Sequence, residues 1–179
     1  METIQEKYQR IRPTLTDGCL FLCSKNKIVS KIIRNCDNSE FSHVGIVFEK
    51  FGRWFIMDSN ANGVHPDLLS ERIDISNNFC FIQPTIGSFY VDKEMKQAII
   101  NSEAGISYDF SNGIKELINR KIGTSLRITK RDRHDICSDY TANYAINLEM
   151  VTEAFQKLEL PFPQDYIRYN DTHTTRILK

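Results

Sequence analysis

Apolar and polar positions alternate, or gather in short blocks, through the first half of the chain. Blocks rich in β-branched and aromatic residues predict strands, because such side chains suit the pleated, half-buried surface of a sheet. These blocks lie at residues 19–23, 42–50, 54–59 and 79–84. Phe51-Gly52-Arg53 predicts a tight turn between the second and third blocks, so those two strands are expected to pair as a hairpin.

Helical spacing of apolar residues dominates the remaining segments. Within 26–35, Ile28, Ile32 and Ile33 fall on one stripe, and the basic residues fall away from it. Residues 124–135 are polar and predict a loop. The helical segments, one of them only a turn or two at 66–73, are 4–12, 26–35, 66–73, 92–105, 111–123 and 137–150. Strands come first and helices follow, which predicts an α+β fold with an antiparallel sheet.

Composition narrows the class of protein. The chain has 179 residues, 41% hydrophobic and 26% charged, which favours one globular domain with a core of its own. Its formal net charge is zero, so the charge of the whole chain favours neither nucleic acid nor an anionic membrane as a partner. The charged N-terminus lacks the apolar core of a signal peptide, and no apolar run approaches the roughly 18 residues of a membrane span. We therefore expect a cytoplasmic protein.

Cysteine spacing argues against a disulfide framework and against a zinc knuckle, because the count is odd and no C-x-x-C pair exists. The five cysteines are Cys19, Cys23, Cys36, Cys80 and Cys137. His43, Asp58, His65 and Cys137 are candidate ligands by type, but they do not have the spacing of a metal motif. Neither a metal nor another cofactor is expected.

One cysteine stands where a helix is predicted to begin. The stretch ICSDYTANYA, residues 136–145, opens with Ile136 and Cys137 and then continues with helical periodicity. Unpaired N–H groups and the positive end of the helix dipole stabilise an anion at such a position. A thiol there tends towards the thiolate, the form that attacks carbonyl carbon. The alternative is a small buried residue that fills the core, because free cysteine is often fully buried.

A histidine and a carboxylate are predicted to meet across the hairpin. His43 and Gly45 share one strand face, and a glycine there indicates a bulge or a close approach of another group. The hairpin brings 43–45 opposite 57–60, so Asp58 is expected next to His43. A carboxylate beside one ring nitrogen fixes the tautomer and stabilises the imidazolium. The alternatives are a core or surface histidine and an aspartate that caps the following turn.

Together these three residues have the logic of a Cys-His-acid site, in which a base activates the thiol and an acid orients the base. Spacing alone leaves open whether Cys137 meets His43. His134, three residues before Cys137, is a rival base on a predicted loop. The other two histidines, His65 and His173, are interpreted as structural or exposed.

Several short motifs follow one another in a specific order over about residues 16–166. They are Asp17-Gly18, Ser30, Ser42-His43-Val44-Gly45-Ile46, Asp58 with Gly63-Val64, Tyr108-Asp109-Phe110, Cys137-Ser138-Asp139 and the segment from Pro161 to Asp165. In this order the chain resembles the permuted papain-like branch of the NlpC/P60 superfamily, the group of YiiX/YebB-like cysteine peptidases and amidases. S-H-V-G-I and the C-S helix are moderately specific singly, and their shared order is more so.

The resemblance implies one circularly permuted papain-like domain over 1–179, with an antiparallel sheet or partial barrel packed by helices. It implies Cys137 as the nucleophile, His43 as the general base and then acid, and Asp58 as the residue that orients His43. Tyr108 is then a candidate substrate-binding residue, with core packing as the alternative. The family usually has Glu where Asp58 stands, and Glu and Tyr where Asp139 and Ile136 flank the cysteine.

The implied activity is that of a thiol hydrolase, a peptidase or amidase, that cleaves an amide bond through an acyl-enzyme. Relatives of the permuted fold also act on lipids, so an acyltransferase or phospholipase-like enzyme with an acyl-lipid substrate is an alternative. A binding or structural module that has lost turnover is another. The basic stretch 120–134 is interpreted either as a solvated loop or as a contact for an anionic group.

Overall fold

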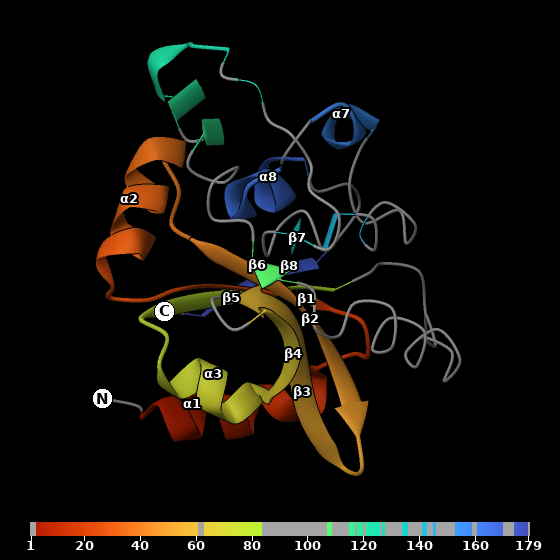
Figure 1. The fold of residues 1–179 in the computed structure, drawn as a ribbon. Helices are drawn as coiled ribbons and strands as arrows, with labels where there is room; N and C mark the ends of the chain where they lie inside the picture. Colours follow the sequence, from red (N-terminus) through yellow and green to blue (C-terminus); the bar gives the residue numbers. More distant parts are fainter. Residues whose placement is uncertain are drawn as a thin grey trace.

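A computed structural model describes most of the N-terminal half of the chain and selected segments of the rest (Figure 1). The described residues are 3–60, 63–83, 107–108, 115–116, 118–119, 121–125, 127, 134–135, 141–142, 145, 153–158, 161–169 and 174–178. The predicted helix at 92–105 lies outside them.

An antiparallel sheet of six strands, in the order β4-β3-β2-β1-β5-β8, forms the centre of the molecule. Two further short strands, β6 and β7, pair in parallel. The strands are β1 (Leu20–Ser24), β2 (His43–Lys50), β3 (Arg53–Asn60), β4 (Gly63–Leu68), β5 (Asn78–Gln83), β6 (Ser107–Tyr108), β7 (His134–Asp135) and β8 (Thr174–Leu178). The helices are α1 (Ile4–Ile11), α2 (Ile28–Asp37), α3 (Leu69–Asp74), α7 (Glu153–Gln156) and α8 (Pro163–Arg168), with a 3₁₀ turn η1 at Arg12–Thr14.

The two faces of the sheet carry separate hydrophobic cores, because successive strand residues point to opposite sides. On what we call the α8 face, Leu22, Val44 and Ile46 pack with Phe155 and Tyr166. On what we call the α1–α3 face, the buried residues are Phe21, Val47, Ile56, Tyr8, Ile11, Leu69 and Ile73. Figure 1 shows α1 and α3 on one side of the sheet and α7 and α8 on the other. The predicted α+β class with an antiparallel sheet is confirmed.

The four predicted strands and the hairpin are confirmed as β1, β2, β3 and β5. The prediction of a helical turn over 66–73 was wrong at its start, because residues 63–68 form strand β4 and helix α3 begins only at Leu69. Pro66 lies within this strand and argued against it in the sequence, because proline is rare inside strands. It is tolerated there because β4 lies at the edge of the sheet, where a missing N–H breaks no ladder.

Other short elements were not predicted. They are η1, β6, α7, α8 and β8, and α8 begins at Pro163 within the segment interpreted as a proline-bound tail. Strand β7 occupies part of the predicted loop 124–135. The described parts of the predicted helices at 111–123 and 137–150 are helical, including the buried Thr141, Ala142 and Ala145.

Glycine at position 45 is required by the packing of the hairpin on the α1–α3 face. A Cβ atom at Gly45 would lie 2.7 Å from Ile56 Cδ1 and 2.9 Å from Asp58 Cβ, closer than such carbon atoms approach in proteins. The missing side chain of Gly45 therefore leaves the space in which the side chains of Ile56 and Asp58 lie.

We expect Gly45→Ala to lower the free energy of unfolding by about 1–3 kcal/mol, the usual cost of overpacking, and to push Asp58 away from His43. Urea unfolding measures the first effect, and the downfield Nε2–H proton signal of His43 reports the second. Gly52→Ala is the control. Its new Cβ meets no atom within 4 Å, so only the positive φ opposes it and the His43 signal is retained. A Gly45→Ala protein that keeps both wild-type stability and the signal contradicts this account.

Candidate functional site

His43 and Asp58 form a buried pair on the α1–α3 face. The β2–β3 register aligns Ile46 with Met57. The next pair in this register is Gly45 and Asp58. The side chain of His43 therefore reaches Asp58 diagonally across the glycine. His43 Nε2 lies 2.7 Å from Asp58 Oδ2, and the two side chains are 13% and 0% exposed. Aspartate, one methylene shorter than the family's usual glutamate, is therefore long enough for this contact.

Arg72 from helix α3 holds the other side of the Asp58 carboxylate. Its Nη2 donates to Asp58 Oδ1 at 3.0 Å and lies 2.9 Å from Oδ2. The same nitrogen donates to Asp67 on β4. Arg72 is itself buried, so its charge and that of Asp58 compensate one another away from water, with the partly exposed Asp67 as a second partner of the guanidinium. The sequence analysis did not single out Arg72, whose only signal was a charge among the apolar residues of a short helix.

The electrostatic balance keeps Asp58 ionised. Burial alone would raise the pKa of this carboxyl, but the opposing effects of His43, through its charge and its hydrogen bond, and of Arg72 and Lys25 are larger together, and the pKa is lowered from its ordinary value of 3.8. Since the carboxylate only accepts, Nε2 of His43 is the donor in this pair. The nitrogen of His43 that faces any other group is then Nδ1.

The thiol of Cys23 lies near the His43–Asp58 pair. Cys23 is the β1 residue opposite His43, and it is fully buried. Burial raises the pKa of the Cys23 thiol, although the charges of His43, Lys25 and Arg72 and a hydrogen bond with Ser76 oppose the change. Since only the thiolate is a nucleophile, Cys23 is a packed neighbour of His43 and is not an accessible nucleophile.

Cys137 lies outside the described residues, so the structure does not place the predicted nucleophile. Strand β7 ends two residues before it in the sequence. β7 pairs with β6, with Tyr108 aligned to Asp135, and β6 contacts β3 and β4. Strand β6, which contains Tyr108, therefore lies next to β3 and β4.

The remaining histidines are placed differently from the pair. His65 on β4 is aligned with Asp58 in the β3–β4 ladder. Its Nδ1 lies 3.2 Å from the Gly63 carbonyl oxygen, and its Nε2 lies 3.4 Å from Asp67 Oδ1. His134 belongs to strand β7, where a loop was predicted. His173 lies outside the described residues.

Comparison with known proteins relates the chain to a solved structure through its fold. No model of a protein family matches the chain, and no curated protein matches it. Its fold is similar to the crystal structure of the metalloprotein YiiX from Escherichia coli O157:H7, with a TM-score of 0.54 and 16% identity over 90% of this chain and 96% of that one. This likeness shows a shared fold, in agreement with the expected YiiX-like relation.

In the described part of the chain, no group of three or more His, Cys, Asp or Glu side chains is arranged to hold a metal ion. None of the helices described is both long and apolar enough to cross a bilayer.

We expect Arg72→Leu to lower the free energy of unfolding by about 3–5 kcal/mol, because it leaves two carboxylates without their buried cation. Adding Asp58→Asn removes one of those charges and recovers part of the loss, which a double-mutant cycle by urea unfolding measures. Arg53→Leu, which removes an exposed arginine of β3, is the control and changes stability little. An Arg72→Leu protein as stable as the control contradicts the described pairing.

Acid should weaken the fold through the same carboxylate. Because the pKa of Asp58 is lower in the folded chain than its ordinary 3.8, its contribution is present above that pH and is lost as the pH falls through the folded value. We expect the urea midpoint to fall with acid below about pH 4, and Asp58→Asn to flatten that part of the curve. Equal acid dependence of the wild type and Asp58→Asn contradicts the assignment.

Proposed function

We propose that the chain is a cysteine-dependent hydrolase of amide bonds, in which Cys137, His43 and Asp58 form the catalytic site. The observation that carries the proposal is the contact of 2.7 Å between His43 Nε2 and the fully buried Asp58 carboxylate. A histidine held in one tautomer by an ionised acid is the part of a thiol hydrolase that activates the nucleophile. Arg72 is the residue that positions Asp58.

The proposed reaction uses both ring nitrogens of His43. Nε2 stays hydrogen-bonded to Asp58, and Nδ1 takes the proton of the Cys137 thiol. The thiolate forms a bond to the carbonyl carbon, and the carbonyl oxygen becomes an oxyanion that a backbone N–H at the helix start can stabilise. The tetrahedral intermediate expels the amine, which takes its proton from Nδ1. Water then attacks the thioester, giving up a proton to His43, and releases the carboxylic acid and the thiol.

The fold proposed for this site is one circularly permuted papain-like domain, with its core over about residues 16–166. Two observations support it. The motifs from Asp17-Gly18 to Asp165 follow the order of the permuted NlpC/P60 branch. The likeness to YiiX extends over 90% of the chain, which is the extent expected if the whole domain is shared.

Metal chemistry does not fit the residues around His43. The YiiX structure is that of a metalloprotein, and the carboxylates beside His43 are candidate metal ligands by type. Arg72 already contacts both Asp58 and Asp67, and its guanidinium occupies the position from which a cation would neutralise them. The proposed mechanism therefore has no metal-dependent step.

An acyl-lipid ester is the second candidate substrate, cleaved or transferred by the same residues. A specific observation favours it, namely that helix α2 exposes apolar and basic side chains. The helix is hydrogen-bonded through Ser30 to Ser42, the residue before His43. The tail of such a substrate would be delivered from a membrane surface. A peptide or other amide and an acyl ester differ in the leaving group, and they require the same thiolate and imidazole.

We expect iodoacetamide to alkylate Cys137 well below the free-thiol pKa of about 8.5, and His43→Ala to abolish that reactivity at low pH. Mass spectrometry reads the rate for each cysteine as a function of pH. His65→Ala is the matched control, because it removes an imidazole from a neighbouring strand without touching the His43–Asp58 contact. It should leave the profile of Cys137 unchanged.

The buried thiols supply an internal reference in the same digest. Burial raises the pKa of Cys19 to about 12 and raises the pKa of Cys80 further, so both should stay unmodified while the protein is folded. The hydrolase proposal is overturned if His43→Ala leaves a rapid alkylation of Cys137 unchanged. It is also overturned if Cys137 is as unreactive as Cys19. The fold is then a binding module that has lost turnover.

A further inference from the structure

Helix α2 presents apolar side chains to solvent. Ile28 is 77% exposed, Val29 46% and Ile32 50%. Only three other large hydrophobic residues are exposed in the part of the chain that the structure describes, and they lie on separate elements. Figure 1 shows α2 at the side of the sheet, away from α1 and α3. The sequence stripe of Ile28, Ile32 and Ile33 is therefore mostly turned outward.

The attachment of α2 to the rest of the molecule is polar. Its buried residues are Ser30 and Asp37. Ser30 Oγ shares a hydrogen bond of 2.5 Å with Ser42 Oγ and accepts another from the Lys25 backbone N–H at 3.1 Å. A surface helix of a globular protein normally buries its apolar stripe and exposes its polar face. In α2 the first turns do the reverse, so the apolar residues are available to something outside the chain.

The charge around these residues has one sign. Residues 24–36 contain four basic side chains, Lys25, Lys27, Lys31 and Arg34, and no acidic one. Lys27 and Lys31 are exposed and alternate with the exposed apolar residues. The rest of the chain must therefore carry a net negative charge, since the total is zero. Basic side chains interleaved with isoleucine and valine match a surface that is anionic outside and apolar beneath.

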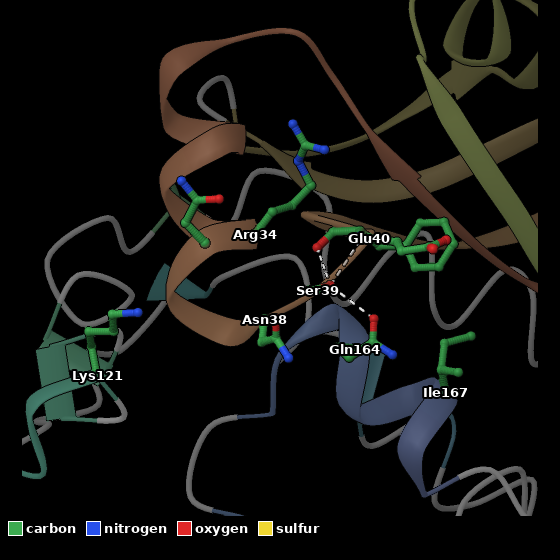
Figure 2. Close-up of a pocket in the computed structure, with 9 residues that line it drawn as sticks. Arg34, Asn38, Ser39, Glu40, Lys121, Gln164 and Ile167 are labelled. Atoms are coloured by element: carbon green, nitrogen blue, oxygen red, sulfur yellow. Dashed lines mark hydrogen bonds between the residues drawn. The ribbon is translucent and has the colours of Figure 1, made fainter.

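A cavity of about 770 Å³ adjoins the C-terminal half of α2. Figure 2 shows Arg34 and Lys121 lining it from different segments, and Glu40, Ser39 and Gln164 also line it. Ser39 Oγ lies 2.6 Å from the Phe41 carbonyl oxygen and 3.1 Å from Gln164 Oε1, two acceptors that share its one proton. These contacts fix the wall of the cavity. Two cations against one carboxylate at its rim are suited to an anionic head group that carries polar substituents.

We propose that Ile28, Val29 and Ile32, with Lys27 and Lys31, form a docking surface for a membrane that contains anionic lipid. The apolar side chains enter the head-group region and the lysines contact phosphates. A protein partner or a second copy of the chain would explain the apolar residues, but neither requires the excess of positive charge. This inference does not rest on the proposed catalysis.

Docking through α2 would place the membrane on the side of the helix opposite to the strand of His43. Ser42, which binds Ser30 of the helix, immediately precedes His43 on β2. Since the hydrogen bond between the two serines is buried, the helix and the start of the strand are held together. The proposed site is therefore attached to the docked helix and lies behind it.

Co-sedimentation with vesicles tests the docking surface on the full chain. Vesicles of phosphatidylcholine alone are compared with vesicles that also contain roughly 30 mol% phosphatidylserine. We expect binding to the anionic vesicles only, and release at high salt. Ile28→Ser/Val29→Ser/Ile32→Ser should weaken binding at least tenfold, and Lys27→Glu/Lys31→Glu should abolish it. These side chains are exposed, and circular dichroism checks that each variant is folded.

Phe51→Ser/Ile75→Ser is the matched control, because these two residues are equally exposed and lie on other elements. It should bind like the wild type. No binding by the wild-type chain, or equal loss in the control, overturns the proposal. So does a concentration-dependent dimer that the α2 variants abolish, which would identify a second copy as the occupant. Because none of these readouts uses Cys137, the outcome is separate from that of the alkylation experiment.

Discussion

The buried carboxylate of Asp58 is the interaction on which this half of the molecule depends. A charge with no exposure to water is tolerated only where opposite charges and hydrogen bonds replace the solvent. Here the replacements come from His43 on β2 and from Arg72 on α3, while Asp58 itself is on β3. Three elements are thus fixed relative to one another by one side chain. The geometry of the histidine depends on this ionic cluster, and the cluster adds to the apolar packing of Leu69 and Ile73 that holds α3 on the sheet.

That coupling fixes the position of His43, although this residue lies at the beginning of a strand. Gly45 lets the neighbouring strand's side chains approach, and Arg72 holds the carboxylate from the far side. Asp67 in turn shares the guanidinium, so strand β4 is drawn into the cluster. An imidazole held in this way needs little reorganisation when its second nitrogen exchanges a proton.

The sequence predicted the local part of this arrangement. A hairpin with a short turn sets the register by itself, so the proximity of His43 and Asp58 followed from counting residues back from Phe51. Arg72 could not be found in that way, because its contact depends on how α3 lies across the sheet. Its helix was also predicted to begin too early, since Pro66 concealed the edge strand that precedes it. The outward orientation of Ile28 could not be predicted, because helical periodicity identifies an apolar stripe but does not show whether that stripe faces the core or the solvent.

The positions of the two cores set a condition on the proposed chemistry. Ala142 and Ala145 pack on the α8 face, whereas His43 and Asp58 belong to the α1–α3 face. The proposed mechanism therefore requires Cys137, five residues before Ala142, to meet His43 around the end of β2 and not through the sheet. Strand β7 makes this route reasonable, because it ends beside β6, and β6 contacts β3 and β4.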